Sequence, residues 1–110
     1  MGYDRIEEVS EQYPHFGGYL AGWGFVMNGD MTENIDRHRG FLELLCKVYP
    51  EYELTLPEYD NDEDYVEGNI ECTGVSIRVY YENIIDYIQL WSANFQAMQS
   101  LHAAVVRLAV

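Results

Sequence analysis

Aspartate and glutamate are the residues of this chain whose number and placement suggest a role in binding. Between Lys47 and Arg78 there is no basic residue, while nine acidic residues occur in this interval with tyrosines among them. Grouped carboxylates attract cations over long distances, and tyrosines supply rigid contact area in protein interfaces. The pattern predicts a partner-binding surface for a cationic protein. Its predicted members are Glu51, Glu53, Glu58, Tyr59, Asp60, Asp62, Glu63, Asp64, Tyr65, Glu67 and Glu71.

The same residues have a plainer interpretation, because charge runs often form a solvated surface that only keeps a chain in solution. Concentrated like charge, however, destabilises a folded chain by self-repulsion. If these segments are strands, Glu51 and Glu53 share one face, and so do Glu67 and Glu71. The charge would then be displayed together, so we favour the binding surface.

One stretch of this surface has the spacing of a calcium loop. Residues 60–64 are rich in carboxylates, and Glu71 stands at the twelfth position counted from Asp60, as in an EF-hand. That loop also needs glycine at its sixth position and a helix on each side. The sixth residue here is Tyr65, and residues 66–73 alternate like a strand. We therefore expect no metal site, and calcium sensing is a minor alternative.

Histidine and cysteine give little support for catalysis. The three histidines are His15, His38 and His102, and they form no HxH or HExxH pair. His38 falls on the apolar stripe of a predicted helix, so a hydrogen-bonded core histidine is expected. Cys46 and Cys72 are expected to be free, buried thiols. We expect no catalytic residue, no cofactor and no enzymatic activity. An enzyme that pairs His38 or His102 with a cysteine is the weakest alternative.

The overall charge restricts the class of partner. The chain has 110 residues and carries 19 Asp and Glu against 6 Lys and Arg, a formal net charge of −13. Phosphate contacts require Lys and Arg, so direct binding to nucleic acid or to an anionic membrane surface is not expected. The first residues lack the basic segment and apolar run of a secretory signal, which predicts a cytoplasmic protein.

Helical spacing of apolar residues predicts two helices in the N-terminal half. The first covers residues 4–13. The second begins at an N-cap, Asp30 or Thr32, and ends before Pro50. Its apolar stripe consists of Ile35, His38, Phe41, Leu42, Leu45, Val48 and Tyr49. Between the two helices, the glycine-rich segment 16–29 is expected to be a mixture of helix and turn whose glycines allow close backbone approach.

From residue 51 the apolar period changes to two, which predicts strands over residues 51–56, 66–73 and 75–81. Residues 84–91 could continue the sheet or begin a helix that runs to the C-terminus. Isoleucine and aromatic residues favour the strand, and Ser92 would be an N-cap for the next helix. The last helix is expected over residues 93–108, with a buried stripe of Phe95, Met98, Leu101, Val105 and Leu108.

Together these elements predict the α+β fold class in a single domain, residues 1–110. Its parts are N-terminal helices, an antiparallel β-meander of three to four strands, and a C-terminal helix packed on the sheet.

The N-terminal half also carries a motif that resembles a known family. Tyr13-Pro14-His15-Phe16 leads into Gly18-Tyr19-Leu20, and an acid-capped amphipathic helix from Asp30 follows. This arrangement is similar to that of immunity proteins of contact-dependent growth-inhibition systems, small bacterial cytosolic proteins that neutralise polymorphic toxins. The second half resembles such proteins in its general make-up, which is acidic and tyrosine-rich without a catalytic motif.

The resemblance implies a function by stoichiometric occlusion. The partner would be a cognate basic toxin domain, typically a nuclease, and carboxylates of the inhibitor would take the places of substrate phosphates. A different class of function is also consistent with the residues. It is a non-catalytic acidic interaction or regulatory module, which could form a homodimer through a strand edge or through the apolar C-terminal helix.

Overall fold

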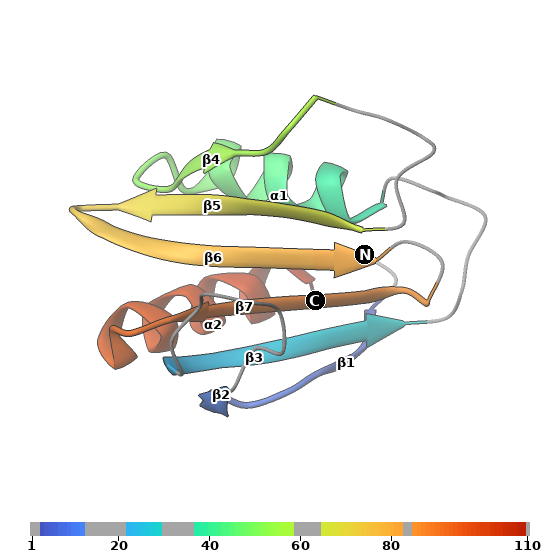
Figure 1. Ribbon diagram of the computed structural model, residues 1–110, viewed down its shortest axis with the longest axis horizontal. Helices are drawn as coiled ribbons and strands as arrows, with labels where there is room; N and C mark the ends of the chain where they lie inside the picture. The colour runs from blue at the N-terminus through green and yellow to red at the C-terminus, as the bar shows by residue number, and fades with distance from the viewer. Residues whose placement is uncertain (1–2, 13–21, 30–36, 59–64, 83–84, 110) are drawn as a thin grey trace.

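The chain forms a sheet of antiparallel strands with two helices packed on one side (Figure 1). The computed structural model describes residues 3–12, 22–29, 37–58, 65–82 and 85–109. The strands are β1 (Tyr3–Ile6), β2 (Ser10–Gln12), β3 (Gly22–Gly29), β4 (Glu53–Thr55), β5 (Val66–Cys72), β6 (Val75–Glu82) and β7 (Tyr87–Ser92). The helices are α1 (Arg37–Val48) and α2 (Phe95–Ala109). The predicted α+β class and the C-terminal helix on the sheet are confirmed.

The sheet has seven strands, more than the three to four that were predicted. Its order is β1-β3-β7-β6-β5-β4, and β2 also pairs with β3. The run from β4 to β7 is the predicted antiparallel meander, in which each strand pairs with the next. The additional strands come from the N-terminal part of the chain, where β3 pairs with β7 and then receives β1 and β2.

The prediction of an N-terminal helix over residues 4–13 was wrong. The described part of the segment 4–13 forms β1 and β2, joined by a short connection in which the Glu7 N–H donates a hydrogen bond to the Val26 carbonyl at 2.9 Å. Ile6 and Val9 have helical spacing, but both side chains pack against the core beneath the sheet. Pairing with the free edge of β3 satisfies the backbone groups that a helix would have satisfied internally, so tertiary contacts override the local pattern.

The prediction for segment 16–29 was also wrong in element type, because its described part, Gly22–Gly29, is a strand. The expected close backbone approach is nevertheless present. A Cβ atom on Gly24 would lie 2.0 Å from the carbonyl oxygen of Leu90, and one on Gly22 would lie 2.5 Å from that of Ser92. Glycine is therefore required on β3 for the backbone of β7 to approach this closely. Residues 16–21 lie outside the described part of the chain.

Helix α1 agrees with the predicted second helix over the described residues. Its buried residues are His38, Phe41, Leu42 and Leu45, all members of the predicted stripe. Val48 was placed on this stripe wrongly, because its side chain is 49% exposed at the end of the helix. The predicted caps Asp30 and Thr32, and the stripe residue Ile35, lie outside the described residues.

The strand alternative for residues 84–91 is confirmed, with β7 beginning at Tyr87 after a turn. The predicted N-cap of α2 was wrong by two positions. Asn94 caps the helix, since its Oδ1 accepts a hydrogen bond from the Ala97 N–H at 2.9 Å, whereas Ser92 belongs to β7. The stripe of α2 is buried at Met98, Leu101 and Val105. Phe95 is 38% exposed because it lies at the first turn, where its ring meets Trp23 edge-on.

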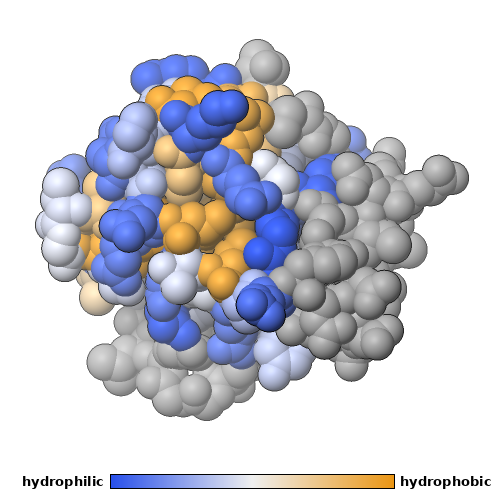
Figure 2. All heavy atoms as spheres, turned by 90° about the horizontal axis from the view of Figure 1, so that it is seen from above, coloured by the Kyte–Doolittle hydropathy of each residue, from blue (hydrophilic) through white to orange (hydrophobic). Residues whose placement is uncertain are grey.

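The hydrophobic core lies between the sheet and the helices. The sheet contributes alternate residues of its central strands, namely Phe25, Met27, Ile77, Val79, Tyr81, Ile88 and Leu90. Viewed from the β4 side, apolar atoms reach the surface between hydrophilic residues (Figure 2). Among the described residues, neither helix is long and apolar enough to cross a lipid bilayer.

Candidate partner-binding surface

The face of the sheet turned away from α1 and α2 carries the predicted acidic residues of the strands. We call it the outer face. Side chains alternate along a strand, and the buried residues of β5 and β6 point to the helices, so their neighbours point outward. On β4, β5 and β6 the outward residues are Glu53, Thr55, Glu67, Asn69, Glu71, Ser76, Arg78, Tyr80 and Glu82.

Two glutamates stand directly opposite each other at one end of the outer face. Glu53 of β4 and Glu71 of β5 are partners in the strand register, and both are exposed. Among the described residues neither forms an ion pair, and the Ser76 hydroxyl donates to Glu71 Oε1 at 2.9 Å. Like charges opposite each other destabilise a sheet by about 0.2–1 kcal/mol. The pair therefore opposes folding and is available to an external cation.

Three tyrosines form a row at the other end of the outer face. Tyr65 is 52% exposed and stacks on Tyr80 with the ring centroids 5.5 Å apart, and Tyr80 meets Tyr87 edge-on at 6.3 Å. Carboxylates flank the row, because Glu67 is the register partner of Tyr80 and Glu82 that of Tyr87. Burial, and then the Glu82 carboxylate, raise the pKa of Tyr80 to about 12, so its hydroxyl keeps its proton at neutral pH.

The structure places the other predicted members around this face. Glu51 and Glu58 are exposed in the segments before and after β4. Beside Glu58, the Pro57 carbonyl accepts a hydrogen bond from Arg39 of α1 at 2.9 Å, which ties this segment to the helix. Five predicted members lie outside the described residues: Tyr59, Asp60, Asp62, Glu63 and Asp64.

Sequence reasoning missed Tyr80, Glu82 and Tyr87. The signal was the alternation of β6, in which Ile77 and Val79 face inward and Tyr80 and Glu82 therefore face outward. Only the register of the β6–β7 pair shows that Tyr87 completes the row. The aromatic part of the surface thus depends on how the strands pair, and the charge pattern of the sequence contains no information about this pairing.

A second polar arrangement is buried at the N-terminal end of α1. We call Tyr3, Arg37, His38 and Asp86 the buried polar cluster. The Tyr3 hydroxyl lies 2.6 Å from His38 Nδ1, and His38 Nε2 lies 3.1 Å from Asp86 Oδ1. Arg37 pairs with the same carboxylate through Nη2, and its guanidinium carbon lies 4.3 Å from the centroid of the Tyr3 ring.

Burial sets the protonation of this cluster. Burial and the adjacent Arg37 lower the pKa of His38 to about 3, and burial raises the pKa of Tyr3. Tyr3 therefore keeps its proton, and its hydroxyl donates a hydrogen bond to the neutral imidazole, while Arg37 compensates the charge of Asp86. The cluster joins β1, α1 and the turn before β7. The predicted burial of His38 in the core is confirmed, with a side chain 1% exposed.

The residues on which the catalytic and calcium-binding alternatives depend have the following surroundings. Cys46 and Cys72 are free, as predicted, but half-buried. His102 lies with its Nε2 2.9 Å from the Glu7 carbonyl oxygen and its ring edge-on to Phe25. Within the described ranges, no three His, Cys, Asp or Glu side chains are grouped so as to hold a metal ion. The chain after Tyr65 is strand β5, which does not supply the second helix of an EF-hand.

No protein-family model, curated protein or solved structure matches the chain. The charges and contacts of this chain are therefore the only basis for inferring its function.

Proposed function

We propose that this protein is an immunity protein that neutralises a cationic toxin domain by binding it one to one through the outer face. The observation that carries the proposal is the Glu53–Glu71 pair, two like charges held opposite each other without a described cation between them. Such a pair opposes folding, and a basic side chain of a partner would relieve the repulsion.

The tyrosine row supports the same proposal. Exposed ion pairs contribute little affinity individually, so a tight inhibitor also needs aromatic residues that lose contact with solvent on binding. Tyr65 offers such an area, and the contact with Tyr80 holds it in place. Carboxylates would steer the encounter and the tyrosines would slow dissociation. A nuclease fits this surface best, because its cleft is built to receive closely spaced negative charges.

The sharpest test uses the substitution Glu53→Lys. A lysine opposite Glu71 creates an attractive cross-strand pair, so the free energy of unfolding should rise by about 0.2–1 kcal/mol. Association with the toxin domain should nevertheless slow by about tenfold at low salt, because a steering charge is reversed. The partner to use is the basic domain encoded by the adjacent reading frame, after toxicity is shown in cells that lack this protein.

Glu43→Lys is the matched control, because Glu43 is exposed on α1 and the charge change is identical. This variant should associate nearly as fast as the wild type. If Glu53→Lys is stable and yet binds and protects like the wild type, the outer face is not the interface and the proposal is wrong.

A homodimeric interaction module is the second candidate. Phe95 and Val106 are exposed on one side of α2, since eleven residues make about three helical turns. Two copies of the chain could pair through this side. Pairing through the β4 edge is less favourable, because this edge strand has three residues, bears Glu53 and is followed by Pro57.

A further inference from the structure

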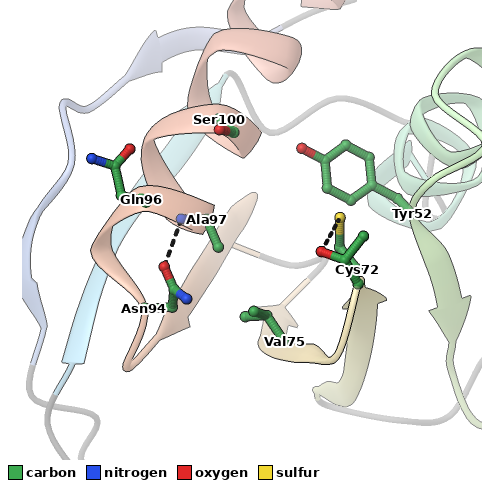
Figure 3. Close-up of a pocket in the computed structure, with 8 residues that line it drawn as sticks. Tyr52, Cys72, Val75, Asn94, Gln96, Ala97 and Ser100 are labelled. Atoms are coloured by element: carbon green, nitrogen blue, oxygen red, sulfur yellow. Dashed lines mark hydrogen bonds between the residues drawn. The ribbon is translucent and has the colours of Figure 1, made fainter.

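A cavity of about 260 Å³ opens at the end of the sheet where β5 turns into β6. It lies between the first turns of α2 and the segment that leads into β4 (Figure 3). Tyr52 and Cys72 border it on one side, Ser100 and Ala97 on the other, and Val75 lies below them. Pockets for drug-sized ligands measure about 300–1,000 Å³, so this cavity suits a single side chain or a very small molecule.

The Tyr52 side chain points an unpartnered hydroxyl into this cavity. The residue is 6% exposed and its ring contacts that of Tyr49. Its hydroxyl forms no hydrogen bond with any described residue and is directed across the cavity toward Ser100 (Figure 3). Tyrosine hydroxyls in protein interiors usually have a hydrogen-bond partner. The Tyr52 hydroxyl opens onto the cavity instead, so a water molecule or a guest that enters the cavity can supply that partner.

The remaining lining also leaves polar groups for a guest. Asn94 is exposed and accepts a hydrogen bond from the Ala97 N–H at Oδ1, and its amide nitrogen makes no hydrogen bond with a described residue. The Thr73 hydroxyl makes only a weak contact with the Cys72 sulfur, 3.9 Å away. Hydroxyl oxygens of Tyr52 and Ser100 therefore remain as acceptors, and Val75 with Ala97 offers apolar contact to an alkyl stem.

The charges around the cavity favour a cationic guest. The three segments that frame it are residues 51–56, 71–76 and 92–101. They contain no Lys or Arg. Glu51, Glu53 and Glu71 belong to the first two segments, with Glu53 and Glu71 on the outer face, across the sheet from the cavity. The field of Glu51 reaches the tyrosine hydroxyl, since this carboxylate adds to the effects of burial and Cys72 that raise the pKa of Tyr52. A carboxylate or phosphate guest would be repelled by the same field.

We propose that this cavity receives the guanidinium or ammonium end of one basic side chain of the partner. The proposal rests on the proposed function, and it assigns the site that holds the partner after the outer face has attracted it. Glu71 and Cys72 are consecutive on β5, so the steering charge and the cavity lie at the same end of the sheet. An anchor residue in a desolvated pocket is the usual source of slow dissociation in tight complexes.

The first test removes the hydroxyl with Tyr52→Phe and closes the cavity with Ala97→Leu. Each variant should dissociate from the toxin domain about tenfold faster with a nearly unchanged association rate. Tyr49→Phe is the matched control, because Tyr49 contacts the same ring and does not line the cavity. Thermal unfolding of each variant shows whether the fold is retained.

A second measurement needs no partner protein. Arginine amide should shift the NMR signals of Tyr52 and Ser100 saturably, whereas citrulline amide, its neutral isostere, should not. Equal shifts with both compounds, or no shift with either, would overturn the cavity proposal. If Tyr52→Phe and Ala97→Leu dissociate like the wild type while Glu53→Lys still slows association, the cavity proposal is wrong and the proposed function stands. If Glu53→Lys also has no effect, both fail.

Discussion

At the scale of single residues, His38 shows how burial changes the behaviour of a titratable group. The apolar spacing of α1 predicted that this histidine is buried, but its partners come from distant parts of the chain. Tyr3 is on the first strand and Asp86 lies in the turn before β7, in a left-handed conformation with φ of 53°. A sequence pattern cannot indicate a cluster of this kind, because only the tertiary fold brings its members together.

This cluster predicts a pH dependence of folding. The pKa of His38 is about 3 in the folded protein and about 6.5 in the unfolded chain. As the pH falls below about 6.5, His38 becomes protonated in the unfolded chain but stays neutral in the folded protein. The stability that is present above this pH is therefore progressively lost. The free energy of unfolding should fall by about 1.4 kcal/mol per pH unit from this residue alone.

Urea unfolding at several pH values between 7 and 5, for the wild type and His38→Gln, measures this contribution. Glutamine does not titrate and can still accept the hydrogen bond from Tyr3. The difference in stability between the two proteins should therefore shrink as the pH falls. Parallel curves would show that His38 does not couple folding to pH.

At the scale of elements, the sequence predicted the parts of the fold whose local pattern and tertiary role agree. The apolar alternation within residues 66–72 and 75–81 corresponds to β5 and β6, and α1 and α2 have the expected apolar faces. The N-terminal strands could not be predicted in this way. Their few apolar residues fit a helix equally well, and the deciding factor is the unpaired edge of β3, which lies far along the chain.

The start of α2 gives a prediction at this scale. Asn94→Ala removes the side-chain acceptor of the Ala97 N–H and should destabilise the protein by about 1 kcal/mol. Asn94→Ser should restore most of this stability, because serine is also a good N-cap. Chemical denaturation of the three proteins measures the effect. An alanine variant as stable as the wild type would mean that the helix does not depend on this cap.

The candidate surface was likewise only partly predictable from the sequence. The sequence could indicate Glu53, Glu67 and Glu71, since a charge excess is visible without a structure. It could not show that Glu53 and Glu71 face each other, because that depends on the register of β4 against β5. The cavity beside Tyr52 depends on three segments that meet only in the fold, and sequence reasoning missed it.

At the scale of the whole molecule, charge is divided between the two layers. Helices α1 and α2 contain four of the six basic residues and one of the nineteen acidic ones. The strands and connections therefore carry nearly all the negative charge. A cationic partner that approaches in solution is drawn to the sheet rather than to the helices. This orientation places the outer face toward the partner, and the cavity opens on the helix side at the same end of the sheet as Glu53 and Glu71.

The same distribution predicts that the protein remains a monomer. A formal net charge of −13 makes two copies repel each other, and the short β4 edge with Glu53 offers a poor template for strand pairing. Sedimentation velocity at moderate salt should give one monomeric species over a wide range of concentration. A dimer that grows with concentration, and that Val106→Lys abolishes, would instead support the homodimeric module through α2. Because Val106 lies on the helix layer, this substitution should leave association with a basic toxin domain nearly unchanged if the outer face is the interface.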